Sequence, residues 1–212
     1  MSNQNPGRGR PQDPQKTENI LKAASKLFLR AGLQRTSMDK LAAEAGVSKQ
    51  TLYTHFKNKD DIFRAVIKAK VKEHRIDPAQ ALPSDHDIET ILSRMGHDLL
   101  TLITDREVVD MFRVVIGESR TYPKIAKLFY ESGPDQAISV MARQLEAQMK
   151  QGTINQDDPR DAAALFSNMC KGELHMQLMM GLRPQNLQQA IDLQVQNATT
   201  SFLAIYRNDE GV

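Results

Sequence analysis

The sequence predicts an all-α protein, with a three-helix N-terminal domain that contains a helix-turn-helix and a larger helical domain after it. Apolar residues recur at helical spacing in successive segments, and no segment shows the alternation typical of a strand. Between residues 36 and 56, two short helix-forming segments are separated by a glycine turn. Charge is divided in the same way: residues 1–75 contain 16 Lys and Arg against 7 Asp and Glu, and residues 76–212 contain 12 against 19.

The first helix precedes the turn and is defined by apolar residues at i, i+3 and i+4. Gly32 follows this stripe and ends the helix, because glycine readily adopts the left-handed conformation that closes a helix C-terminus. The stripe consists of Ile20, Ala23, Ala24, Leu27, Phe28 and Ala31.

The next two helices form the helix-turn-helix. Ser37 is the expected N-cap of a helix over 38–45, and Gly46 ends that helix. Ser48 then caps a second short helix over 49–56, whose apolar residues at i and i+4 face inward. The polar residues of this second helix are left on its outward face.

That outward face carries the side chains that a DNA major groove requires. Lys49, Gln50 and Thr51 lie at the N-terminal end, which comes nearest the base edges in a helix-turn-helix. Lysine can donate to guanine, glutamine can pair with adenine, and the threonine methyl group can contact thymine. We therefore expect these three residues to read the base sequence.

Five further residues are expected to contact phosphates and fix the position of the protein without reading sequence. For three of them a structural role is the alternative. Capping alone explains Ser37, a place in the core would explain Tyr53, and the end of a helix would explain His55. The five residues are Thr36, Ser37, Tyr53, His55 and Lys59.

The excess of positive charge in residues 1–75 coincides with this motif. Nucleic-acid binding therefore explains the charge better than the alternative, an ordinary solvated surface.

Residues 1–15 are predicted to be a disordered basic tail, since they are polar and rich in Pro, Gly, Asn and Gln. Arg8 and Arg10 stand in an Arg-Gly-Arg-Pro sequence that can insert arginines into an A·T-rich minor groove. A tail that only aids solubility is an equal alternative.

A fourth helix is expected to begin after the cap Asn58 and to run to about residue 76. The proline-containing segment that follows marks a domain boundary. The DNA-binding domain is therefore assigned to 16–76 and the second domain to 77–212.

The second domain is predicted to contain six helices, several of which begin at a proline, where the missing N–H has no consequence. Glycines at 117, 133, 152 and 181 are expected to mark helix ends. The predicted helices cover 88–104, 106–118, 123–131, 134–151, 159–180 and 184–206.

Residues 17–63 resemble the N-terminal domain of the TetR family of bacterial transcriptional regulators, in the first helix ending LFLRAG, the Thr-Ser cap, AAEAGVS, TLYTHF and KNKDDIF. Residues 106–181 are similar to the C-terminal domains of regulators grouped with AefR. The resemblance implies an all-helical homodimer that binds a palindromic operator in double-stranded DNA, usually represses, and is released by a small molecule in its C-terminal domain. It places DNA contacts at Thr36, Lys49, Gln50, Thr51, Tyr53, His55 and Lys59.

The last two predicted helices are apolar on more than one face, so each needs two partners, and the resemblance implies that they pair with their copies in a four-helix dimer interface. Dimerisation is also expected because symmetric DNA half-sites require a two-fold protein. An ordinary core is the alternative for about half of these residues. The predicted interface residues are Leu165, Met179, Ile191, Val195, Ala198 and Phe202.

A small apolar effector is expected to bind where methionine and aromatic side chains gather, since methionine adapts to varied apolar molecules. Plain core packing is the alternative for this cluster. A protein of the same fold that recruits a protein partner, or activates transcription without an effector, is the alternative function. The predicted ligand-binding residues are Met111, Phe112, Phe129, Phe166, Met169, Cys170, Glu173 and Met176.

The sequence contains no H-E-x-x-H, no C-x-x-C and no Gly-rich loop after a strand, so we expect no enzymatic activity, no metal and no cofactor. A single cysteine, Cys170, excludes an internal disulfide framework. No apolar run reaches the roughly 18 residues of a membrane span, and the N-terminus lacks the apolar core of a signal peptide. These features predict a cytoplasmic protein that does not associate with membranes.

Overall fold

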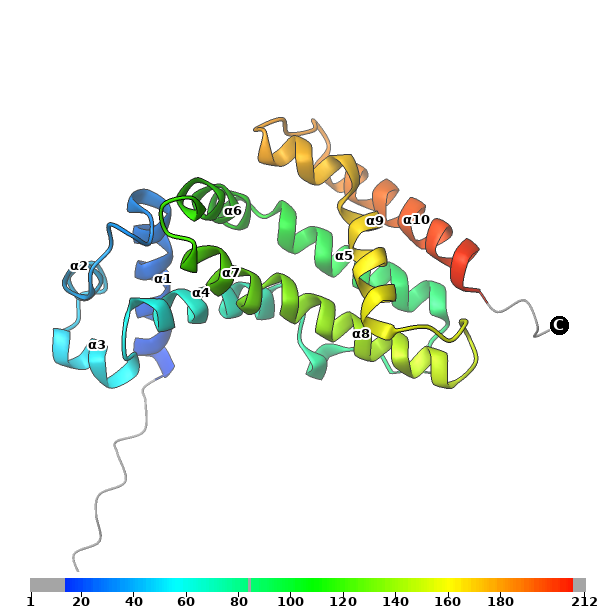
Figure 1. Cartoon of the computed structure of the whole chain (residues 1–212), viewed down its shortest axis with the longest axis horizontal. Helices are drawn as coiled ribbons and strands as arrows, with labels where there is room; N and C mark the ends of the chain where they lie inside the picture. The colour runs from blue at the N-terminus through cyan, green and yellow to red at the C-terminus, as the bar shows by residue number, and fades with distance from the viewer. Residues whose placement is uncertain (1–13, 84, 208–212) are drawn as a thin grey trace, which may run out of the picture. The chain divides into compact units, whose positions relative to one another are not determined.

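The computed structural model describes residues 14–83 and 85–207, and this part of the chain is built from helices (Figure 1). The predicted all-α fold class is confirmed, and the described residues contain a single isolated β-bridge, between Ile154 and Arg207. The chain divides into two compact units, one up to Val66 and one from Ile67. Arg8 and Arg10 lie outside the described residues.

The first unit contains α1 (Pro14–Ala31), α2 (Met38–Glu44), α3 (Lys49–His55) and the beginning of α4 (Lys59–Glu73). Pro14 and Gln15 belong to α1, so the predicted disordered tail is wrong for these two residues. Phe28 and Phe63 meet edge to face at 5.5 Å in the centre of the unit and are fully buried. Apart from Ala31, the apolar stripe of α1 is buried in this unit, where α1 packs on α2 and α2 packs on α3.

The turn between α2 and α3 has the conformation that its glycine predicts. Gly46 has φ +65°, and the Val47 amide donates to the carbonyl of Ala42 at 3.0 Å. A left-handed residue closed by such a bond is a regular helix C-terminus. Ser48 then starts α3 by accepting a hydrogen bond from the amide of Thr51 at 3.0 Å.

The second unit contains the rest of α4 and six further α-helices. Their predicted extents agree closely with the structure, except that α10 begins only after Asn186, which caps it, and that Gly117 lies inside a helix where an end was expected. The helices are α5 (Ile88–Thr104), α6 (Arg106–Ser119), α7 (Lys124–Ser132), α8 (Pro134–Lys150), α9 (Pro159–Met179) and α10 (Leu187–Tyr206), and a short 3₁₀ helix, η1 (Pro78–Gln80), precedes them. None of the helices within the described ranges is both long and apolar enough to span a bilayer.

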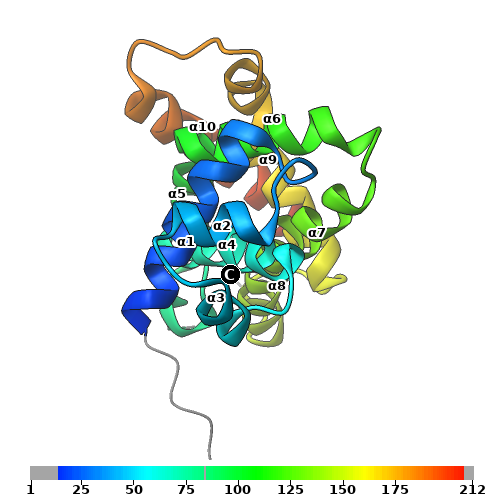
Figure 2. The same ribbon diagram turned by 90° about the vertical axis from the view of Figure 1, so that its left-hand side faces the viewer.

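The core of the second unit lies between α5, α8, α9 and α10, and α10 runs beside both α5 and α9 (Figures 1 and 2). Phe166 of α9 and Phe202 of α10 meet edge to face at 5.3 Å and are fully buried. Cys170 is buried in the same core. This packing accounts for the inner apolar stripe of each of the two last helices.

Four of the predicted dimer-interface residues belong to this core. Their side chains are buried by other helices of the same chain, so they are not available to a second copy, and the prediction is wrong for them. Of the other two, Leu165 is at the surface and Met179 is partly buried. The four buried residues are Ile191, Val195, Ala198 and Phe202.

Candidate functional site

The N-terminal half of α3 is open to solvent. Lys49 and Gln50 are exposed and Thr51 is partly exposed. Tyr53 is 49% exposed, so the alternative that it is a core aromatic is wrong. Leu52, next to it, is the buried residue of this helix. The structure therefore presents a polar edge of α3 of the kind that a major groove accepts.

Ser37 and Ser48 both act as helix caps. The hydroxyl oxygen of Ser37 accepts from the Lys40 amide at 3.3 Å, and that of Ser48 is also 2.8 Å from the Thr51 hydroxyl. Each cap satisfies a backbone donor that a short helix otherwise leaves unpaired. Contact between Ser37 and phosphate remains a prediction.

Thr36 has a different position from the one expected. Its side chain is buried, and its hydroxyl donates to the carbonyl of Gly32 at 2.6 Å. The hydroxyl thus closes the connection after α1 and is withdrawn from the surface. We correct the expected phosphate contact of this side chain to a structural role in the turn.

Lys59 lies at the start of α4 and is partly buried. Its ammonium donates to three backbone carbonyls, those of Leu33 at 2.8 Å, Gln34 at 3.1 Å and Thr36 at 3.1 Å. An ammonium has three N–H donors, so these acceptors can take all of them. The side chain joins α4 to the connection between α1 and α2, a role that no local pattern around residue 59 shows.

His55 and Lys49 are each paired with another helix of the first unit. The Nδ1 atom of His55 is 3.0 Å from the hydroxyl of Thr17 in α1. The ammonium of Lys49 is 2.7 Å from a carboxylate oxygen of Asp39 in α2, and this hydrogen bond raises the pKa of Lys49. Both members of the second pair are exposed, so a DNA contact by Lys49 would compete with Asp39.

The predicted ligand-binding residues do not form one cluster. Phe112 packs on Phe129 at 4.6 Å, and its ring also meets that of His175 at 5.2 Å, so α6, α7 and α9 come together there. Phe166 and Cys170 belong instead to the core beside α10. The remaining members are Met111, which is buried, Met169, which is partly buried, and Glu173 and Met176, which are exposed.

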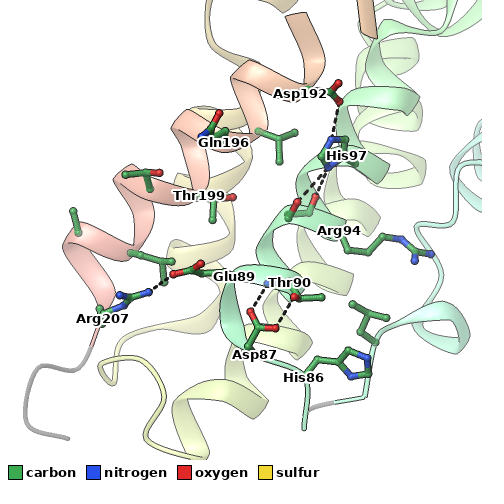
Figure 3. A pocket seen from close by; sticks show the side chains of 16 residues that line it. His86, Asp87, Glu89, Thr90, Arg94, His97, Asp192, Gln196, Thr199 and Arg207 are labelled. Carbon is green, nitrogen blue, oxygen red and sulfur yellow. Dashed lines mark hydrogen bonds and ion pairs between the residues drawn. The ribbon is translucent and has the colours of Figure 1, made fainter. Parts of the chain in front are cut away.

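Sequence reasoning missed a groove of about 1080 Å³ between α5 and α10 (Figure 3). At one end, His97 Nε2 lies 3.0 Å from Asp192 Oδ1; at the other, Arg207 pairs with Glu89 at 2.5 Å. Between them, the buried hydroxyl of Thr199 has no hydrogen-bonding partner in the described structure. The paired residues are about a hundred positions apart in sequence, so no spacing rule could have found them.

An exposed, capped helix-turn-helix attached to a separate helical unit defines the class of protein: a transcriptional regulator with a DNA-reading and a regulatory domain. Residues 20–66 match the family described as bacterial regulatory proteins, tetR family. Residues 90–208 match the AefR-like transcriptional repressor, C-terminal domain. The chain belongs to the TetR family of transcriptional regulators, and its second domain is of the AefR-like type.

Known proteins resemble this chain either over nearly its whole length or over only part of it. The flavonoid-responsive regulator FrrA is 31% identical with a TM-score of 0.74, covering 93% of this chain and 100% of FrrA. The repressor SCO4008 of Streptomyces coelicolor is 35% identical over 85 residues, which are 39% of this chain and 42% of that protein. The chain thus spans less than half the length of this curated relative.

The structure of SmeT in complex with triclosan shares the fold. It has a TM-score of 0.65 at 20% identity and covers 92% of this chain and 93% of SmeT.

Proposed function

We propose that this protein is a homodimeric repressor that binds a palindromic operator and is released from it by a small molecule. The observation that carries the proposal is the exposed N-terminal edge of α3, with Lys49, Gln50 and Thr51 on a helix held by two serine caps. Tyr53, His55 and Ser37 flank this edge and are proposed to contact phosphates. The activity is regulatory and takes place in the cytoplasm, where the operator DNA is.

The proposal is tested by footprinting on the promoter of the protein's own gene and of its neighbours. Protection of an inverted repeat that survives excess random DNA at moderate salt is expected. Gln50→Ala should relax base preference at one position of each half-site, because glutamine pairs with adenine through its amide. Equal affinity for operator and random DNA would contradict the proposal.

The dimer is proposed to form through the outer faces of α9 and α10, in place of their buried stripes. Besides Met176, the exposed apolar side chains of these helices include Leu165, which is 36% exposed, Leu193 at 58% and Ile205 at 56%. Burying apolar surface of this kind is the main driving force for stable homodimers. A four-helix arrangement with the same helices of a second copy would cover all three residues.

Leu193→Glu is expected to convert the dimer to a monomer and to reduce operator affinity together with it, because each half-site needs its own chain. Leu182→Glu is the matched control, since Leu182 is similarly exposed but follows α9. Light scattering measures the mass of each variant. A dimeric Leu193→Glu protein would place the interface elsewhere.

The effector is proposed to be a small aromatic compound. FrrA is flavonoid-responsive by its name, and SmeT was solved with triclosan, which supports an aromatic ligand for this chain too. The site proposed for its apolar body is the cluster of Phe112 and Phe129. Release of the labelled operator by flavonoids or chlorinated phenols, followed by fluorescence anisotropy, tests this assignment.

A further inference from the structure

Helix α9 is interrupted at Gly172, which has φ 43° and ψ −148°. The side chain of Gln194, from α10, donates through Nε2 to the carbonyl of Met169 at 2.7 Å. A Cβ atom at position 172 would lie 2.6 Å from the same Nε2 atom. The break is therefore held by a specific contact with α10 and requires the glycine.

His175 follows the break and turns its ring against Phe112 in α6. The Nδ1 atom of His175 is inaccessible to solvent and has no hydrogen-bonding partner among the described residues, although the ring as a whole also interacts with the backbone of Ile103. Such an atom costs free energy unless something else pairs with it, and buried polar atoms of native proteins nearly always have a partner. A bound molecule with a polar atom at this point would supply it.

Lys171 precedes the break and is partly buried. Within residues 14–83 and 85–207 its ammonium donates a hydrogen bond to the amide oxygen of Asn168 at 3.4 Å and forms no ion pair with a carboxylate. Burial lowers the pKa of Lys171. Burial, followed by the positive charge of Lys171, lowers the pKa of His175, and a hydrogen bond with the backbone of Ile103 raises it to a smaller extent, so the charge of Lys171 acts on the partly buried ring.

The neighbouring acid does not neutralise this pair. Glu173 is exposed and accepts a hydrogen bond from the side chain of Gln177 at 3.1 Å. A partly buried ammonium without a carboxylate is unfavourable, and an anion brought to it in a site of low dielectric gains more than it would in water. Phe112 and Phe129 form an aromatic wall beside His175 that is suited to an apolar body.

We propose that Lys171 and His175 bind the acidic group of the effector, so that the natural ligand is an organic anion: a carboxylate, phenolate or sulfonate on an apolar, preferably aromatic, body. The inference rests on the proposed function, because it names the chemical class of the effector of that same domain. Lys171 supplies the charge and His175 a hydrogen bond. Phe112 and Phe129 contact the apolar part.

The test uses two fluorescent probes that differ in one group, with the full-length protein. 1-Anilinonaphthalene-8-sulfonate has a sulfonate, and N-phenyl-1-naphthylamine is the same ring system without it. Lys171→Met is expected to weaken binding of the sulfonate about tenfold, which corresponds to about 1.4 kcal/mol, and to change binding of the neutral probe less than about twofold. Lys150→Met, which removes an exposed lysine paired with Glu146 on α8, is the control and should change neither.

Three results would overturn the inference: wild-type protein that binds both probes equally, wild-type protein that does not bind the sulfonate, or a ratio of affinities unaffected by Lys171→Met. NMR titration of His175 gives a second readout in the same variant. Its pKa should rise when the neighbouring charge is removed, which shows that Lys171 acts on this ring.

Operator binding by wild-type protein is measured separately and without a probe. If the protein failed to bind any inverted repeat, the proposed function would be wrong while the anion site could still stand. If the operator were bound and the two probes were not discriminated, only the anion site would be wrong.

Discussion

Replacing Lys59 by methionine separates a structural from a DNA-binding role for this residue. The ammonium donates to three carbonyls, two of them in partly buried positions. A hydrogen bond to a charged group is worth about 1.5–3 kcal/mol, but the three bonds share one donor group and the freed carbonyls can be rehydrated. We expect Lys59→Met to lower the free energy of unfolding of the first unit by about 2 kcal/mol, a typical cost for losing a partly buried network.

Lys57→Met is the matched control, since Lys57 is exposed and two residues away, so the variant removes the same charge from the same surface. Its effect on stability should be within about 0.5 kcal/mol. Hydrogen exchange of the amides in residues 33–66 of the full-length protein measures the local stability, because exchange from a cooperative unit reports the free energy of its opening. The change in exchange protection should be about thirtyfold for Lys59→Met and less than about threefold for Lys57→Met.

Salt dependence of operator binding completes the experiment. A lysine that contacts a phosphate changes the slope of log K against log salt by about 0.9 when it is removed. Because the donors of Lys59 are occupied by carbonyls, its removal should change the slope no more than removal of Lys57 does. Equal stability of the two variants, with a selective change of slope for Lys59→Met, would refute this reasoning and restore the phosphate contact predicted from the sequence.

Three further predictions follow from single contacts. Asp39→Asn should raise operator affinity a few-fold in anisotropy titrations, because Lys49 no longer has to leave an ion partner; unchanged affinity would show that the pair does not compete with DNA. Gly172→Ala should lower the unfolding free energy by about 1–3 kcal/mol, whereas the helical Gly117→Ala, which meets nothing within 4 Å, should raise it by about 0.5–1 kcal/mol in denaturant titrations. Cys170 should resist thiol reagents at pH 8 until the protein unfolds, since burial raises the pKa of its thiol to about 12; rapid labelling of native protein would contradict this.

The pH dependence of stability follows from the same thiol. Its pKa is raised to about 12 in the folded protein, whereas an unfolded cysteine ionises near pH 8.5. The folded state therefore retains a proton that the unfolded state loses, and this contribution is fully present below about pH 8.5 and is lost as the pH rises toward 12. Cys170→Ala should flatten the loss of stability across this range in denaturant titrations.

Helix positions could be predicted from the sequence because the signals are local. Ser48 and Gly46 determine one turn through their own side chain or backbone conformation, and the structure shows the same caps. Lys59 could not be interpreted in this way, because its acceptors lie more than twenty residues earlier in the chain. The groove that has His97 and Asp192 at one end could not be predicted for the same reason, since tertiary packing alone brings α5 and α10 together.

The dimer-interface prediction was wrong for its four buried residues for a related reason. A hydrophobic stripe at helical spacing shows that a helix face is buried, but it does not show whether the covering surface belongs to the same chain or to another. On α10 the regular stripe through Val195 and Phe202 is covered by α5 and α9. Leu193, on the outer face of α10, does not belong to this stripe, and periodicity cannot distinguish it from an ordinary exposed leucine.

Gly117 and Gly172 show where local rules stop being sufficient. Both stand within helical patterns, yet the first continues its helix and the second interrupts one, because only the second meets a side chain, Gln194, that bonds to the carbonyl released by the break. Local rules are broken most often where function requires it. Gln194 and Leu193 are adjacent on α10, so an anion bound beside the break would act on the same helix that carries the proposed dimer face.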